Sequence, residues 1–204
     1  MNAATRHLIQ ADPIFATLIR RVGRCGLVVD KGEPYAALVN AIAHQQLHGR
    51  AARAILARFQ ALYPDTPFPT PAQILSTPDT TLRGCGFSAN KIAAIRDIAA
   101  KAAEGLVPTR RAAARLSDAA LIERLTAIRG VGRWTVEMLL IHTLGRPDIL
   151  PVDDFGVREG FRRLHRLPAQ PRPRDLAAMG EAWAPCRSTA AWYLWRAAEF
   201  PEGE

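Results

Sequence analysis

Residue types that begin helices alternate along the chain with residue types that end them. This pattern limits the chain to a series of short helices. Ser88 precedes a helical pattern that ends at Gly105, and Ser117 precedes another at 118–128 with acidic residues in its first turn. No run of alternating β-branched residues is long enough for a sheet, and the best strand candidate, GLVVD at 26–30, is short. The pattern therefore predicts an all-α fold.

The other helical stretches are also separated by glycine and proline. Asp12 is the predicted N-cap of a helix over 14–23, and residues 34–63 resemble two helices broken near Gly49. The prolines at 64–71 indicate a loop, because proline at that density cannot continue a helix. We expect these helices to form two lobes.

The charge favours a polyanionic partner. The 204 residues carry a formal net charge of +8 and a sequence pI near 10.2, and apart from Lys31, Lys91 and Lys101 the positive side chains are arginines. Nucleic acid is the commonest such partner, whereas the alternative is a solvated surface of an arginine-rich chain. No apolar run reaches the roughly 18 residues of a membrane span, and the start shows no secretory signal. The chain has only three cysteines, far apart in sequence, so we expect a protein of the reducing cytoplasm.

The cysteines do not suggest a disulfide framework or a zinc site. Cys25, Cys85 and Cys186 are odd in number, far apart and form no CxxC pair. His44 and His48 have the i,i+4 spacing of metal ligands, but no third ligand accompanies them. We therefore expect no metal on side chains.

A Gly-Val-Gly turn separates two helical stretches in LTAIRGVGRWTVEMLL, at 125–140. Gly130 and Gly132 permit backbone angles that other residues resist, and the N–H groups of the helix beginning near Arg133 can bind an anion. One DNA phosphate is the expected ligand. The alternative is a helix C-cap followed by a linker. The residues expected to contact DNA here are Gly130, Val131, Gly132, Arg133 and Thr135.

Four segments together resemble one family. LTAIRGVGRWTVE at 125–137 resembles the hairpin of the helix–hairpin–helix (HhH-GPD) DNA glycosylase superfamily, and LGRPDILPVDDFGVREGF at 144–161 resembles its Gly/Pro-rich segment with an aspartate. ALVNAIAHQQLHGRAA at 37–52 and WAPCRSTAAWYLW at 183–195 resemble two further signatures. Within the superfamily the chain is most similar to the type II 3-methyladenine DNA glycosylases, in a compact form without their N-terminal β-domain.

The resemblance implies a division of the chain. Residues 32–146 are expected to form a six-helix lobe that includes the hairpin. Residues 1–31 and 147–204 are expected to form a second helical lobe with the catalytic aspartate. DNA would lie across a cleft between the two lobes.

The resemblance assigns the catalytic role to Asp154. Cleavage of an N-glycosidic bond develops positive charge on the sugar, which a carboxylate can stabilise while it orients a water molecule. A position at the start of the helix after Pro151 favours the ionised form. The alternative is that both Asp153 and Asp154 only cap that helix. We expect Asp153 to be a cap or supporting residue.

The position occupied by lysine in the strand-nicking members of the superfamily is Trp134 here. Without the amine no Schiff base forms, so the resemblance implies a monofunctional glycosylase without lyase activity. The iron–sulfur cluster of those members needs four C-terminal cysteines, and this chain has only Cys186 there.

Aromatic residues should line a pocket for the extruded base, because their faces attract a cationic alkylated purine. By resemblance Trp134, Phe155 and Trp195 are pocket residues, and Met138 replaces a tyrosine, which softens one wall. The alternative for each aromatic residue is core packing, which we expect for Trp183 and Trp192.

A helix–helix turn should supply the side chain that fills the gap left by the flipped base. By resemblance Gln46 is this plug, and Leu47 is the neighbouring candidate. His48 would lie near the minor groove. Gln45 is the remaining residue of this turn that we expect to contact DNA. The alternative is that these residues form only a polar turn that caps two helices. The backbone carbonyls of Thr126, Ile128 and Val131 could hold a monovalent cation, again by resemblance.

We therefore expect a monomeric, monofunctional DNA glycosylase that removes alkylated bases, of the 3-methyladenine and 7-methylguanine type, from double-stranded DNA without an obligatory cofactor. One alternative is a helix–hairpin–helix protein that binds damaged DNA without catalysis. Another is a glycosylase for oxidised or mismatched bases.

Overall fold

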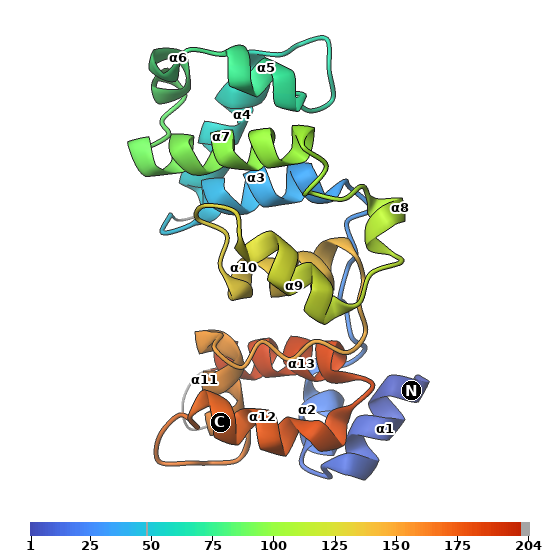
Figure 1. The fold of residues 1–204 in the computed structure, drawn as a ribbon. Coiled ribbons are helices and arrows are strands. Elements are labelled where there is room, and N and C mark those ends of the chain that lie inside the picture. Colours follow the sequence, from blue (N-terminus) through green and yellow to red (C-terminus); the bar gives the residue numbers. More distant parts are fainter. Residues whose placement is uncertain (48, 201–204) are drawn as a thin grey trace. The chain divides into compact units, whose positions relative to one another are not determined.

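A computed structural model describes residues 1–47 and 49–200 of the chain. Every regular element in these residues is a helix, as Figure 1 shows, which confirms the all-α prediction. Residues 26–30 form no strand and run through the chain without regular secondary structure. His48 lies outside the described residues.

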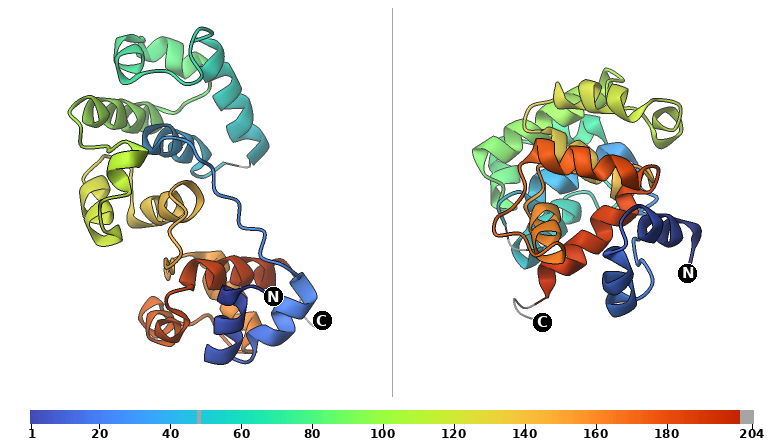
Figure 2. Two further views of the ribbon diagram at one scale, coloured as in Figure 1. Left: turned by 90° about the vertical axis from the view of Figure 1, so that its right-hand side faces the viewer. Right: turned by 90° about the horizontal axis from the view of Figure 1, so that it is seen from below.

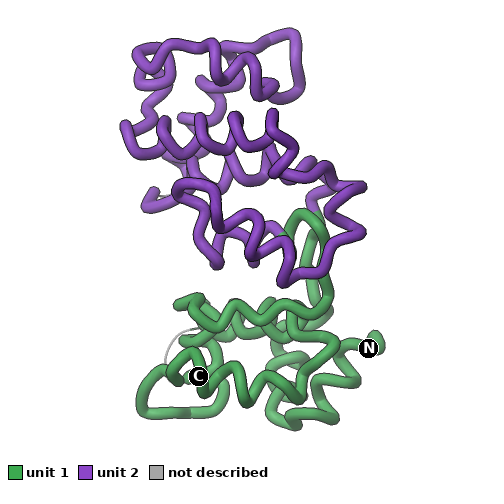
Figure 3. Tube along the Cα trace, viewed as in Figure 1, with its two compact units in different colours: residues 1–29, 140–204 green, residues 30–139 purple. Residues whose placement is uncertain are grey.

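The chain divides into two compact units, coloured separately in Figure 3. One unit comprises Met1–Val29 and Leu140–Glu204, and the other comprises Asp30–Leu139. We call them the terminal unit and the hairpin unit. The functional division expected at residues 31/32 and 146/147 stays a prediction.

The hairpin unit contains eight helices in its described residues: α3 (Pro34–His44), α4 (Gly49–Ala61), α5 (Pro71–Ser76), α6 (Asp79–Gly84), α7 (Ala89–Ala103), α8 (Arg110–Ala113), α9 (Asp118–Thr126) and α10 (Arg133–Met138). Helix α7 packs against α3, α5 and α6, and α10 packs against α9 and α3 (Figure 1). The unit's apolar side chains meet around α7, whose residues Ile95 and Ile98 are fully buried.

Local side-chain caps explain where several helices begin. The hydroxyls of Ser88 and Ser117 accept hydrogen bonds from the backbone N–H groups of Lys91 and Ala120, which confirms both predicted N-caps. Thr70 forms a capping box with Gln73, so that α5 begins directly after the proline-rich loop.

The terminal unit joins both ends of the chain. Its helices are α1 (Ala3–Ala11), α2 (Phe15–Val22), the π-helix η1 (Leu139–Thr143, whose first residue belongs to the hairpin unit), α11 (Phe155–Leu164), α12 (Pro173–Gly180), the 3₁₀-helix η2 (Glu181–Trp183) and α13 (Arg187–Glu199). Helices α1 and α2 pack against α13, far away in sequence (Figure 2).

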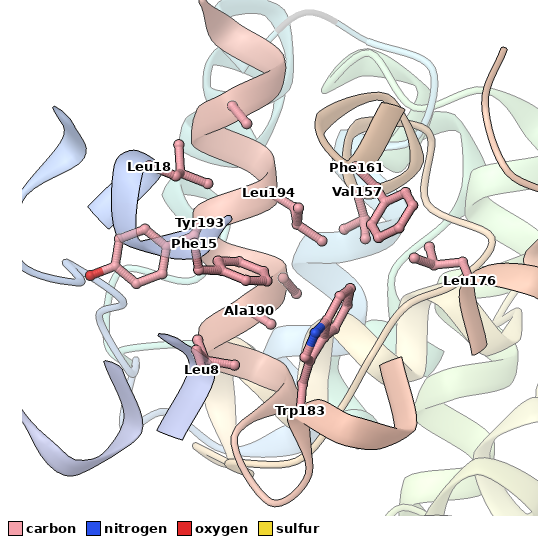
Figure 4. Packing of buried hydrophobic residues seen from close by; sticks show 12 residues of the cluster. Leu8, Phe15, Leu18, Val157, Phe161, Leu176, Trp183, Ala190, Tyr193 and Leu194 are labelled. Atoms are coloured by element: carbon pink, nitrogen blue, oxygen red, sulfur yellow. The ribbon is translucent and has the colours of Figure 1, made fainter. Parts of the chain in front are cut away.

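The core of the terminal unit forms around Trp183, which is 1% exposed (Figure 4). Its indole meets Phe15 edge to face, with ring centroids 5.4 Å apart, and it packs with Leu176 and Phe161. The prediction that Trp183 is a core residue is confirmed. Trp192 is only partly buried, on the margin of the same cluster.

Helices α11 and α13 are in backbone-to-backbone contact. A Cβ added to Gly160 would lie only 1.8 Å from the carbonyl oxygen of Leu194. Only glycine permits this approach. The close packing holds the start of α11 beside α13.

The predicted cap at Asp12 is wrong. Asp12 ends a helix that was not expected, α1, and the N-cap of α2 is Ile14, without a side-chain hydrogen bond. The Asp12 carboxylate still accepts a hydrogen bond from the Ile14 N–H. The turn after Pro13 therefore delays the helix start by two residues relative to the local pattern.

Candidate functional site

Asp154 is the N-cap of α11. Its Oδ1 accepts one hydrogen bond from the Val157 N–H at 2.8 Å and a second from Trp195 Nε1 at 2.8 Å. The Asp154 N–H donates to the Pro151 carbonyl, so a turn from Pro151 brings the carboxylate to the helix start. Two N–H donors thus fix the position of this oxygen at the start of the helix.

Of the two roles expected for Asp153, that of helix cap is wrong, and that of supporting residue stays a prediction. Asp153 is exposed and precedes the N-cap, because the turn ends one residue later than expected. Capping and chemistry do not exclude each other at Asp154, because one carboxylate can do both. Its Oδ1 accepts the capping bond and also the bond from Trp195.

Trp195 lies on α13, and its indole ring has one neighbour at its edge and another on its face. A Cβ at Gly156 would lie 2.9 Å from Trp195 Cδ1 and 3.2 Å from Asp154 Oδ1, so α11 contacts the indole edge closely. On its face, the indole stacks with the His142 imidazole, with centroids 5.5 Å apart and ring planes 26° apart. Burial lowers the pKa of His142 below its ordinary value.

The other proposed pocket residues differ in exposure. Phe155, directly after Asp154 in the terminal unit, is 72% exposed. Trp134, the second residue of α10 in the hairpin unit, is 44% exposed, and Met138 at the end of α10 is half-buried. Within the terminal unit, the structure brings Asp154 and Trp195 into direct contact.

The hairpin between α9 and α10 is seated on α7. Gly130 has φ +77°, and a Cβ there would lie 2.9 Å from the Ala94 Cβ. The Arg129 N–H before the turn donates to Asp97 Oδ2 at 2.7 Å. Gly130 therefore needs both its positive φ and its lack of a side chain.

Gly132, in contrast to Gly130, does not use the unusual backbone angles that glycine permits. Gly132 has φ −88° and ψ 169°, which any residue adopts, and a Cβ there would meet nothing within 4 Å. Next to it, Arg133 is paired with the buried Glu137, Nε to Oε1 at 2.9 Å, while the Arg133 side chain stays 61% exposed. Val131 and Thr135 are buried, so any contact from Thr135 to a ligand would use its backbone.

The turn after α3 is tied to the hairpin. Gln45 Nε2 donates to the Gly130 carbonyl at 3.1 Å, and Lys91 Nζ donates to the Ala43 carbonyl at 2.9 Å. Gln46 is exposed and has φ +56°, which is uncommon for a residue other than glycine. Leu47 is 40% exposed. The turn thus presents two exposed side chains on an anchored backbone.

The structure also describes the carbonyls considered for a cation. Thr126 ends α9, and the Ile128 carbonyl accepts a hydrogen bond from the Val131 N–H at 3.1 Å. In residues 1–47 and 49–200, no group of three or more His, Cys, Asp or Glu side chains could hold a metal ion. Cys25, Cys85 and Cys186 are all free thiols.

Sequence reasoning missed His142, Gly156, Lys91 and Asp97. His142 is a lone polar residue in the apolar stretch LLIHTL, and the spacing of Gly156 and Gly160 is that of a close helix contact. These signals mark unusual positions but do not identify their partners.

Residues 39–186 match the HhH-GPD superfamily of base excision DNA repair proteins. The match covers more than half of the chain, which therefore belongs to this superfamily. Among curated relatives, DNA-3-methyladenine glycosylase 1 of Schizosaccharomyces pombe is 45% identical, over 99% of this chain and 90% of its own length.

Two solved structures extend the similarity to the fold. The S. pombe 3-methyladenine DNA glycosylase in complex with abasic DNA matches with a TM-score of 0.87 at 46% identity, covering 96% of both chains. The DNA-3-methyladenine glycosidase of Bacillus halodurans matches with a TM-score of 0.88 at 32% identity, over 97% of this chain and 90% of its own. In the described part of the chain, no helix is long and apolar enough to cross a membrane.

Proposed function

We propose that this protein is a monofunctional DNA glycosylase that hydrolyses the N-glycosidic bond of alkylated bases, of the 3-methyladenine and 7-methylguanine type, in base excision repair. The observation that carries the proposal is the Asp154 carboxylate at the start of α11, held by Val157 N–H and Trp195 Nε1–H. The similarity to glycosylases named for 3-methyladenine supports the substrate class.

In the proposed reaction the bond from sugar C1′ to the base nitrogen breaks, and its electron pair leaves with the base. The ionised Asp154 stabilises the positive charge that develops on the sugar. Water then adds its oxygen to C1′ and loses a proton to the carboxylate or to solvent. An alkylated purine is already cationic and leaves as a neutral base, so no dedicated general acid is required.

We assign contact with the extruded base to Trp134, Phe155, Trp195 and Met138. The exposure of Phe155 and Trp134 supports this role, because large apolar side chains that remain exposed are available to stack on a ligand. Aromatic faces attract cations, which suits a positively charged base. Met138 adapts its shape and would tolerate more than one lesion.

Trp134 occupies the position of the Schiff-base lysine, and an indole cannot form an imine. We therefore propose that the protein leaves abasic sites unnicked. The same residue argues against a strand-nicking glycosylase for oxidised bases.

We assign DNA contact to the hairpin residues Gly130, Val131, Gly132, Arg133 and Thr135. The open space at Gly132 supports the role, because it admits a phosphate to the N–H groups at the start of α10. The affinity should fall steeply with salt.

We propose that a side chain of the turn at 45–48 fills the gap that the flipped base leaves in the duplex. Gln46 is the proposed plug and Leu47 its alternative, since both are exposed. Gln45 contacts DNA or supports the turn through Gly130, and His48, outside the described residues, contacts the minor groove.

A monovalent cation on the carbonyls of Thr126, Ile128 and Val131 is a further proposal. A carbonyl oxygen that already accepts one hydrogen bond, as that of Ile128 does, retains a second lone pair for a cation. The cation would shield a DNA phosphate near the hairpin. We also propose that the protein acts as a monomer and is cytoplasmic.

The test is release of methylated bases from alkylated duplex DNA by wild type, Asp154→Asn and Asp153→Asn. Asn keeps a capping oxygen but loses the charge, so we expect Asp154→Asn to lose about 10²–10³-fold in rate while it still binds DNA. Asp153→Asn makes the same charge change one residue away and should retain the rate.

Release that Asp154→Asn leaves unchanged would contradict the catalytic assignment. Nicked products would contradict the monofunctional assignment. Binding of the alkylated duplex without any release would favour a damage-recognition protein.

A further inference from the structure

We infer that His142 is a positioning residue for the catalytic carboxylate: its imidazole holds the Trp195 indole in the orientation in which Nε1–H donates to Asp154. The inference rests on the proposed function of Asp154. It concerns a side chain for which neither the sequence motifs nor the chemistry of base release requires a role.

The neighbours of Trp195 limit how its indole ring can rotate. The indole has one N–H donor, and that donor points at Asp154 Oδ1 from 2.8 Å. The backbone of α11 at Gly156 limits the indole at its Cδ1 edge, and His142 covers one of its faces. A rotation of the indole away from Asp154 must therefore separate the ring from His142.

The backbone that carries His142 is not an ordinary α-helix. It lies in the π-helix η1, between α10 and the loop that leads to Asp154. A π-helical turn inserts an extra residue and redirects the side chains that follow, and such turns recur at functional sites. In residues 1–47 and 49–200, the His142 ring stacks on Trp195, and the structure shows no hydrogen bond from its imidazole. Ring shape, and not hydrogen bonding, therefore fits its role.

The charge of the His142 imidazole also suits this role. Burial lowers the pKa of His142, which favours the neutral imidazole. A neutral ring adds no positive charge beside a site that must accept a cationic base and a cationic sugar. An aromatic ring without charge, such as phenylalanine, should therefore substitute for it, whereas a small side chain should not.

The experiment compares His142→Ala, His142→Phe and a matched control, His165→Ala. His165 is also a half-buried histidine stacked on an aromatic ring, Phe161, and its Nε2 lies 3.2 Å from the carboxylate of Asp12. Two quantities are measured for each variant: the single-turnover rate of base release, and the indole N–H resonance of Trp195 in ¹H–¹⁵N spectra, assigned with Trp195→Phe.

We expect His142→Ala to move or broaden the Trp195 resonance and to lower the rate by about tenfold, with DNA affinity changed less than about twofold. His142→Phe should restore the resonance and most of the rate. His165→Ala should leave both as in wild type, even if it lowers stability.

An unmoved Trp195 resonance in His142→Ala would overturn the inference, as would a rate for His142→Phe as low as that of His142→Ala. The resonance is read without substrate. If wild type releases no base, the proposed function therefore fails, while the spectra still decide whether His142 positions Trp195.

Discussion

The indole N–H of Trp195 donates a hydrogen bond to Oδ1 of Asp154 at 2.8 Å, across 41 positions of the sequence. The same oxygen accepts the N–H that caps α11. The carboxylate is thus fixed by its own helix and by a neighbouring one. Precise placement of a charged group before the reaction is a main source of electrostatic catalysis.

The donor of Trp195 should matter separately from its ring. Trp195→Phe keeps an aromatic face but removes the hydrogen bond to Asp154, so we expect single-turnover base release to fall by about tenfold. Thermal unfolding should change little, because the ring remains packed. Trp192→Phe, on the margin of the core, is the control. A rate equal to wild type for Trp195→Phe would show that the hydrogen bond does not contribute.

Gly156 should be required for activity more than for stability. Alanine there favours the helix by about 0.5–1 kcal/mol, but its Cβ would displace Trp195 or Asp154. We expect Gly156→Ala to lower base release by at least about tenfold while the protein stays folded. Gly84→Ala, where a Cβ meets nothing within 4 Å, should be silent in the same rate and circular dichroism measurements. Full activity in Gly156→Ala would contradict the prediction.

The two glycines of the hairpin should behave differently. Gly130→Ala forces a positive φ on alanine and a contact with Ala94, so we expect the free energy of unfolding to fall by about 1–3 kcal/mol. Gly132→Ala should fold normally but bind duplex DNA more weakly, because its methyl group occupies the space proposed for a phosphate. Urea unfolding and binding titrations at fixed salt separate the effects. Unchanged DNA affinity in Gly132→Ala would contradict the proposed contact.

Acid should weaken the terminal unit through Glu159. Hydrogen bonds from Arg162, Arg163 and Gln170 lower its pKa from 4.5 to about 2. As the pH falls, Glu159 therefore binds a proton at a higher pH in the unfolded chain than in the folded protein. The stabilisation is complete above the ordinary pKa of 4.5 and is lost as the pH falls through about 2. Urea unfolding should show wild type more stable than Glu159→Gln by at most about 3 kcal/mol at pH 7.

The difference between wild type and Glu159→Gln should shrink as the pH falls below 4. Glu123→Gln, an exposed carboxylate on α9, is the control and should show no comparable pH dependence. A difference that stays constant down to the acid limit of folding would mean that charge on Glu159 does not stabilise the fold.

The sequence predicted the helix starts at Ser88 and Ser117, and these predictions are confirmed. Its errors lay at turns. Asp12 was expected to cap a helix whose N-cap is Ile14, and a cap at Asp153 would lie one residue before the observed N-cap, Asp154. Turns are harder to predict because a shift of one residue changes which side chain caps the helix without changing the local composition.

The helical class of the protein, the hairpin and the position of Asp154 at the start of a helix can all be predicted from the sequence. Each depends on interactions within one or two turns of the chain. The folded protein was needed to show that Trp195 donates to Asp154, that His142 stacks on Trp195 and that Gly130 lies on α7. These contacts join residues far apart in sequence, and they arise from the packing of whole helices, which no local pattern specifies.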